Sequence, residues 1–285
     1  RNQGKYTFEL DAQAQLRQQN WPFELAFSHA PWQLEVQGQP LQIERTNINA
    51  SGTLDNYRVD VDALTQLAAY PQVSTSLQAQ GSLTGINAAP LQLRASDSHV
   101  EVTTSVAWRD GVSADFSAQL THLHSEYLLD TVRSDLSGQL QGRVSVESPQ
   151  QWLVELKPSS LSGTINEQPL TFNAELNIDS DLSGDIHAFS VRQGENTLVI
   201  NGRIDEQWQL AGELNLSSSS PLYQGYSGQG QAQFSIEGQR LSPKLQLQLQ
   251  LATLQGEGLR VSDATLDITG QYQQADLEYD LDAEV

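Results

Sequence analysis

Two histidines, His122 and His124, stand two positions apart in the segment THLHSE, with Glu126 close by. On a β-strand this spacing places both imidazoles on one face, where they could bridge a transition metal. A structural zinc site needs four ligands, and no further ligand stands at a suitable spacing. We therefore expect no metal site, and we interpret both histidines as polar surface residues of a strand.

The segment DSDLSGD, from Asp179 to Asp185, begins like a calcium-binding loop. Its fifth position is Ser183 where Asp or Asn is required, and its twelfth is Ser190 where a bidentate Glu is required. A solvated turn is the better interpretation of this segment.

Carboxylate pairs such as Asp60 with Asp62, and Asp280 with Asp282, are the residue types that glycosidases use. Hydrolysis needs the two carboxylates placed across a cleft, whereas each of these pairs has the spacing of the polar face of one strand. The serine-rich segment Ser217–Pro221 lacks the G-x-S-x-G elbow of a serine nucleophile. The chain has no cysteine, which removes thiolate chemistry and disulfides. We therefore expect a protein that is not an enzyme and has no cofactor.

The charge of the chain limits its partners. The 285 residues carry a formal net charge of -20, which disfavours nucleic acid and broad adsorption to anionic membranes. The chain contains no methionine and begins at Arg1, so we interpret it as a piece of a longer protein. No apolar run reaches the roughly 18 residues of a membrane span. We find no linker, and expect residues 1–285 to form one continuous elongated domain.

Alternation of apolar and polar residues dominates the chain. In KLQLQLQL, four leucines (Leu245, Leu247, Leu249 and Leu251) alternate with glutamines, so one face of a strand is leucine and the other is glutamine. Turn residues recur about every 8 to 14 positions, which is typical of an all-β chain of consecutive short strands. The only helical hint is Asp62–Pro71, where the leucine spacing and a final proline suggest one or two turns.

Three hairpins have a register that keeps one face apolar. Three-residue loops at 109–111 and 205–207, and a two-residue loop at 55–56, satisfy this condition. The predicted opposed pairs are Trp108 with Val112, Ile204 with Trp208, Ile200 with Gly212, Leu54 with Tyr57, Gly52 with Val59, and Ala50 with Val61. These registers predict an antiparallel meander and not a parallel β-helix.

The chain contains an internal repeat. QAQGSLTGINAAP (78–90) matches QAQFSIEGQRLSP (231–243), and QGRVSVESP (141–149) is a weaker third copy. Repeats of this kind indicate an elongated array in which each unit packs against its neighbours.

Almost no helix is available to cover the apolar face, which leaves three arrangements: a two-sheet sandwich, a closed barrel, or a curved open trough. Glycines on the apolar stripe allow a sheet to bend, and its aliphatic residues suit acyl chains, so we favour the trough. Its predicted lining consists of Ala50, Leu54, Tyr57, Val59, Val61, Leu77, Val100, Val102, Val106, Trp108, Val112, Phe116, Leu120, Phe172, Leu176, Ile178, Ile200, Ile204, Trp208, Leu210, Leu214, Phe234, Ile236, Leu245, Leu247, Leu249, Leu251, Leu266 and Ile268.

Two segments carry a resemblance to a known family. YRVDVDALTQLAAYPQVSTSLQAQGSLTGINAAPLQLRA and YSGQGQAQFSIEGQRLSPKLQLQLQLATLQGEGLRVSDATLDITG resemble the repeats of the TamB family, within the AsmA-like group. The third copy lacks the spacing between glycine and proline. The resemblance implies a U-shaped antiparallel sheet, called a β-taco, whose apolar groove lies in the periplasm of a Gram-negative bacterium. It implies a parent protein that is anchored in the inner membrane and reaches the outer membrane.

The resemblance also implies a function. Such proteins are similar to bridge-like lipid transfer proteins, so the expected ligand is the acyl chain of a phospholipid moving between the membranes during outer-membrane biogenesis. The alternative is an assembly partner of outer-membrane β-barrel proteins, acting with an Omp85-type, TamA-like protein that binds other parts of the parent chain. A closed adhesin or scaffold with a dry core is a third interpretation.

Overall fold

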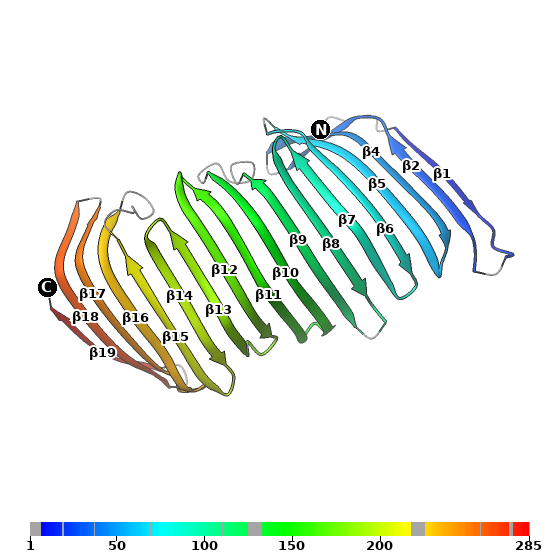
Figure 1. The fold of residues 1–285 in the computed structure, drawn as a ribbon. Helices are drawn as coiled ribbons and strands as arrows, with labels where there is room; N and C mark the ends of the chain where they lie inside the picture. Colours follow the sequence, from blue (N-terminus) through cyan, green and yellow to red (C-terminus); the bar gives the residue numbers. More distant parts are fainter. Residues whose placement is uncertain are drawn as a thin grey trace. The chain divides into compact units, whose positions relative to one another are not determined.

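The computed structural model describes residues 7–18, 20–36, 38–68, 70–109, 111–124, 133–217, 226–256, 258–273 and 276–284. These residues form antiparallel strands and, in the described ranges, no helix (Figure 1). The chain divides into two units, Arg1–Ser148 and Pro149–Val285, which we describe separately. The prediction of an all-β antiparallel meander is confirmed.

The described residues of unit 1 form ten strands. They are β1 (Phe8–Ala14), β2 (Phe23–His29), β3 (Trp32–Val36), β4 (Gln39–Thr53), β5 (Asn56–Leu67), β6 (Val73–Ser82), β7 (Gly85–Ala95), β8 (Ser98–Ala107), β9 (Val112–Leu123) and β10 (Ser134–Ser148). From β4 to β10, each strand pairs with the next strand in the chain.

The described residues of unit 2 form nine strands, and from β11 to β19 each strand pairs with its neighbours in the chain. They are β11 (Gln151–Ile165), β12 (Gln168–Asp179), β13 (Gly184–Gln193), β14 (Asn196–Ile204), β15 (Gln207–Leu216), β16 (Ser227–Gln239), β17 (Lys244–Gly256), β18 (Leu259–Gln273) and β19 (Asp276–Glu284).

The first strands of unit 1 depart from a simple meander. Both β2 and β3 pair with the long strand β4, β2 along residues 47–52 and β3 along residues 39–43. Ala30 and Pro31 separate the two strands. Because proline has no backbone N–H to donate to a ladder, it interrupts what would otherwise be one strand.

Two of the three predicted hairpin registers are confirmed. Val106 pairs with Ala114, and continuing this register places Trp108 opposite Val112. Ile200 pairs with Gly212, which is the predicted pair. The same register places Ile204 opposite Trp208 across the turn between β14 and β15.

The predicted register of the β4–β5 hairpin is wrong by two residues. Thr53 pairs with Asn56, so the turn residues are Leu54 and Asp55, and Gly52 faces Tyr57. A Cβ on Gly52 would lie 2.4 Å from the carbonyl oxygen of Asn56, so the glycine allows the strands to close there. A shift of two residues keeps every side chain on its predicted face, because side chains alternate with a period of two.

The predicted helical turns at Asp62–Pro71 are also wrong. β5 continues through Leu67, and it pairs with β4 on one side and with β6 on the other. The leucine spacing that suggested a helix is too short to outweigh two ladders of backbone hydrogen bonds. The β4–β5 ladder has one irregularity, between Ile43 and Arg45 of β4.

The repeat is visible in the structure as a set of buried small residues. Ala79 on β6, Gly142 on β10 and Ala232 on β16 occupy the same position of the three copies, and all three are buried. The copies diverge after this point. Pro90 lies within β7, whereas Pro243 lies in the turn before β17.

Candidate functional site

One apolar face is continuous across unit 1. Directly opposed residues of antiparallel neighbours share a face, so the registers can be followed from strand to strand. One row of this face runs through Ala12, Leu25, Ala50, Val59, Ala79, Ala88, Thr104, Phe116 and Gly142. A parallel row passes through Phe27, Ile48, Val61 and Leu77. The rows hold a single hydroxyl and no charge.

Unit 2 has the same organisation. One row contains Ala174, Phe189, Ile200, Gly212, Phe234, Leu247, Ile268 and Leu281. The adjacent row contains Phe172, Val191, Leu198, Leu214, Ala232, Leu249, Leu266 and Ala283. In each unit, we call the side of the sheet that carries these rows, with the other residues of the same strands that alternate onto that side, the apolar face.

The predicted lining residues fall on the apolar face, with two qualifications. Leu54 lies in the turn between β4 and β5 and not in a row. Trp108 lies just beyond β8, where its backbone N–H donates to the carbonyl of Thr84 and its Nε1–H donates to the carbonyl of Leu83 at 2.8 Å. Whether the face binds a lipid stays a prediction.

Sequence reasoning missed several members of the apolar face, among them Phe23, Phe27, Ile48, Phe189 and Val191. The alternation that would reveal them is present in the segments FELAFSH and HAFSV. Aromatic contacts join some of them across strands. The rings of Phe172 and Phe189 meet edge to face, with centroids 5.7 Å apart.

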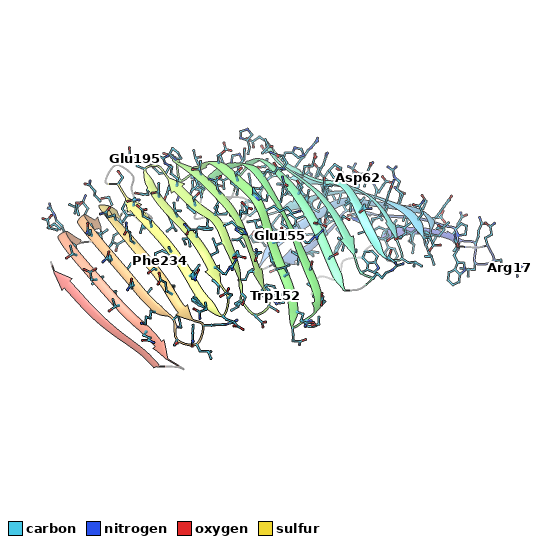
Figure 2. The ribbon with its side chains drawn as sticks, turned by 60° about the horizontal axis from the view of Figure 1, so that its bottom comes forward. Arg17, Asp62, Trp152, Glu155, Glu195 and Phe234 are labelled. Carbon is cyan, nitrogen blue, oxygen red and sulfur yellow. The ribbon has the colours of Figure 1, made fainter. Side chains whose placement is uncertain are left out.

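The apolar face is largely uncovered. No large side chain in the described part of the chain is fully buried, and the buried apolar residues there are four alanines and one leucine: Ala79, Ala88, Ala174, Ala232 and Leu120. The accessible surface is 18613 Å². A compact protein of this mass would expose about 12,000 Å². In Figure 2 no second layer lies over Phe234 on β16. Among the residues that the structure describes, neither unit therefore encloses a dry core between two layers.

The opposite face is polar and carries exposed ion pairs. Arg58 Nε lies 2.9 Å from Asp60 Oδ2, and Arg203 Nε lies 2.6 Å from Asp185 Oδ1. The side-chain hydrogen bonds from the two arginines lower the pKa of both carboxyls below its usual value. Asp60 and Asp62 stand opposite Gln78 and Ser76, which places both aspartates on this solvated face as predicted.

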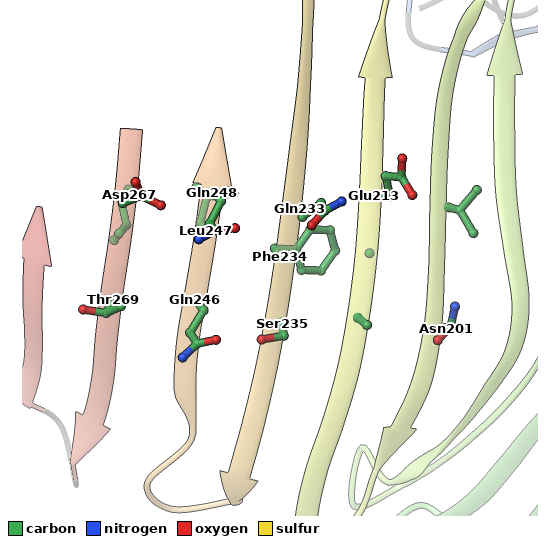
Figure 3. Close-up of a pocket in the computed structure, with 14 residues that line it drawn as sticks. Asn201, Glu213, Gln233, Phe234, Ser235, Gln246, Leu247, Gln248, Asp267 and Thr269 are labelled. Carbon is green, nitrogen blue, oxygen red and sulfur yellow. The ribbon is translucent and has the colours of Figure 1, made fainter. Parts of the chain in front are cut away.

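A hollow of about 570 Å³ lies in unit 2, lined by residues of β14 to β18 (Figure 3). Most of its lining belongs to the polar face: Val199, Asn201, Ala211, Glu213, Gln233, Ser235, Gln246, Gln248, Asp267 and Thr269. Between these polar-face residues along the strands stands one row of the apolar face, formed by Gly212, Phe234, Leu247 and Ile268. The hollow arises where short side chains such as Ala211 and Ser235 lie among longer amides and carboxylates. Amide, hydroxyl and carboxylate side chains make up most of the lining from the polar face, beside the apolar side chains of Val199 and Ala211.

His122 on β9 and His124 just beyond the end of that strand do not converge on a common site. His122 Nδ1 lies 3.0 Å from Asp135 Oδ1, whereas His124 Nε2 lies 3.3 Å from Asp97 Oδ2. The hydrogen bond from His124 lowers the pKa of Asp97. Glu126 lies outside the described residues. Within those residues, no group of three or more His, Asp or Glu side chains is arranged to hold a metal ion.

The segment predicted to be a solvated turn forms the connection between β12 and β13. Asp179 Oδ1 accepts hydrogen bonds from the backbone N–H groups of Asp181 and Ser183, each at 2.9 Å. The carboxylate therefore closes its own turn, as aspartates commonly do in Asx-turns. The pair Asp280 and Asp282 lies on β19, opposite Thr269 and Asp267. Of Ser217–Pro221, only Ser217 is among the described residues.

Comparison with known proteins gives one consistent result. The family model "TamB, N-terminal domain" matches residues 1–285. A curated relative, "Translocation and assembly module subunit TamB" of Haemophilus influenzae, is 24% identical over 269 residues, covering 93% of this chain. The chain spans about a fifth of that relative's length, since the match covers 21% of it. No solved structure matches the chain.

Proposed function

The chain belongs to the TamB N-terminal domain family, and we propose that it is a segment of a non-enzymatic conduit for phospholipids. The observation that carries the proposal is the continuous, uncovered apolar face of each unit, which has an ion-paired, hydrophilic face behind it. Burying an acyl chain stabilises by about 0.8 kcal/mol per methylene. Because successive strands repeat the same apolar rows, a chain that moves from one strand to the next exchanges one aliphatic contact for another.

The proposal places the segment in the periplasm, where curvature of the sheet would form the groove between the two membranes. No helix in the described ranges is long and apolar enough to span a membrane. We propose that an anchor in the inner membrane and an Omp85-type, TamA-like partner engage other parts of the parent protein. Acyl tails would lie on the apolar face, with the head groups at its open, wet side.

Quenching by brominated lipids tests which face meets acyl chains. In a chain whose five tryptophans are replaced by phenylalanine, single tryptophans are placed by Leu249→Trp and by Gln248→Trp. These positions are neighbours on β17 but face opposite sides. With phospholipids brominated on the acyl chain, we expect quenching at position 249 and little at 248. Equal quenching, or none, would contradict the conduit.

A second candidate function is assembly of outer-membrane β-barrel proteins, favoured by exposed strand edges. β3 pairs with β4 alone and β1 with β2 alone, so among the described residues each has one edge outside any ladder. Such an edge can bind an extended client strand through main-chain hydrogen bonds. Photocrosslinking from Gln33 on β3 and from Leu247 on β17 separates the candidates. Client protein at Gln33 would support assembly, whereas lipid at Leu247 alone would support the conduit.

A further inference from the structure

The phenyl ring of Phe234 lies across Gly212 on the neighbouring strand. The two residues are directly opposed in the β15–β16 ladder and share the apolar face. A Cβ built on Gly212 would lie 2.2 Å from Cζ and 2.3 Å from Cε1 of the ring. The outer part of the ring therefore occupies the space that any larger residue at position 212 would fill. The ring leans over β15 and does not stand upright from the sheet.

A tyrosine and a glycine repeat this arrangement in unit 1. Tyr57 on β5 is directly opposed to Gly81 on β6. A Cβ on Gly81 would lie 2.4 Å from Cζ and 2.5 Å from the hydroxyl oxygen of Tyr57. A third pair, Tyr226 with Gly256, has its closest approach at 2.4 Å from Cδ1.

Backbone conformation does not explain these glycines. Gly52 and Gly202 have φ values of 130° and 135°, a region that L-residues rarely adopt. Gly81, Gly212 and Gly256 are not among the residues with positive φ. For these three glycines, the contact that excludes a side chain is an aromatic ring, whereas for Gly52 and Gly202 it is backbone.

We propose that Gly81 and Gly212 are positioning residues that hold Tyr57 and Phe234 flat along the apolar face, which keeps the path of an acyl chain clear. This inference rests on the proposed conduit and deepens it. A methyl group at position 212 would force the ring of Phe234 into a different rotamer. The ring would then rise from the sheet between Ile200 and Leu247, which lie in the same row.

Ring removal provides a rescue test in the full chain. Binding of dansyl-labelled phosphatidylethanolamine is measured for wild type, Gly212→Ala, Phe234→Leu and the double variant. Gly212→Ala should bind about tenfold more weakly, as expected if contact with about two methylenes is lost. The double variant should regain wild-type affinity, because the shorter leucine side chain at position 234 does not reach over position 212 as the phenyl ring does.

Gly202→Ala is the matched control. The new methyl group there would clash with the backbone carbonyl oxygen of Gln209 and not with an aromatic ring. Phe234→Leu should not rescue it. If Gly212→Ala binds like wild type, or if Phe234→Leu fails to restore binding, the positioning role is overturned while the conduit stands. If wild type itself binds no lipid, the conduit is overturned, and the positioning role with it.

Glycine-selective NMR tests the geometry without lipid. The chain contains 20 glycines, and a proton beneath an aromatic ring resonates upfield of the others. The Hα resonances of Gly212 and Gly81 should be displaced upfield, and Phe234→Leu should return only that of Gly212. If the Hα resonance of Gly212 does not move when Phe234→Leu removes the ring, the proposal is overturned.

Discussion

Leu247 on β17 lies directly opposite Phe234 on β16, and both side chains stand on the uncovered apolar face. Gln248 follows Leu247 in the chain and faces the other way, toward the polar hollow. The two sides of one strand therefore have separate chemistry. Substitutions at adjacent positions can distinguish a binding surface from a requirement for folding.

A charge on the apolar face should abolish lipid binding and leave the fold intact. Leu247→Asp places a carboxylate where acyl chains would lie, and an unpaired charge is costly to desolvate. We expect phospholipid to co-purify with wild type and to be absent from Leu247→Asp, as measured by native mass spectrometry and lipid extraction. Gln248→Asp is the control and should retain lipid. Loss of lipid from both variants, or from neither, would contradict the assignment of the face.

The same change in unit 1 should block transport, because a conduit has to be continuous. Val102 pairs with Ala118 on the apolar face, whereas Thr103 pairs with Ser117 on the polar face. In the full-length parent, Val102→Asp should stop lipid transfer and Thr103→Asp should not. Transport that survives charges at both Val102 and Leu247 would eliminate the conduit.

Gly202→Ala should destabilise unit 2 more than Gly258→Ala does. Both glycines have positive φ, but a Cβ on Gly202 would clash with the Gln209 carbonyl, whereas one on Gly258 meets nothing within 4 Å. Gly258→Ala should therefore cost only backbone strain, about 1 kcal/mol. We expect about 3 kcal/mol or more for Gly202→Ala in urea unfolding. Equal losses would show that φ alone matters at Gly202.

The Arg203–Asp185 pair should make stability fall in acid. Arg203 lowers the pKa of Asp185, so its contribution is present above the unfolded-state pKa of about 3.9 and is lost as pH falls through the folded-state value. Arg203→Gln should lower the thermal midpoint slightly at neutral pH and leave it unchanged in strong acid. Because both side chains are partly exposed, high salt should shrink the difference. A difference that grows in acid would reverse the expected sign.

The alternation of the sequence by itself determined which side chains share a face. In the leucine–glutamine segment of β17, each residue's face follows from its position alone, because a strand has a period of two. The same property explains why the β4–β5 register could be wrong by two residues while Tyr57 and Val59 stayed on the correct face. The helix predicted at Leu64 and Leu67 was wrong for a different reason. A few leucines at helical spacing do not reveal that a strand lies on either side of β5.

Only the tertiary structure decided which residues of neighbouring strands meet on each face and whether a second layer covers that face. Nothing local in the sequence states that no second layer covers Phe234, because coverage depends on where distant strands go. The contact between Phe234 and Gly212 depends on a register across two strands, and the hollow on the polar face depends on five. The sequence determines the chemistry of each face through local alternation, whereas the non-local pairing of strands determines which residues meet and which remain open to a ligand.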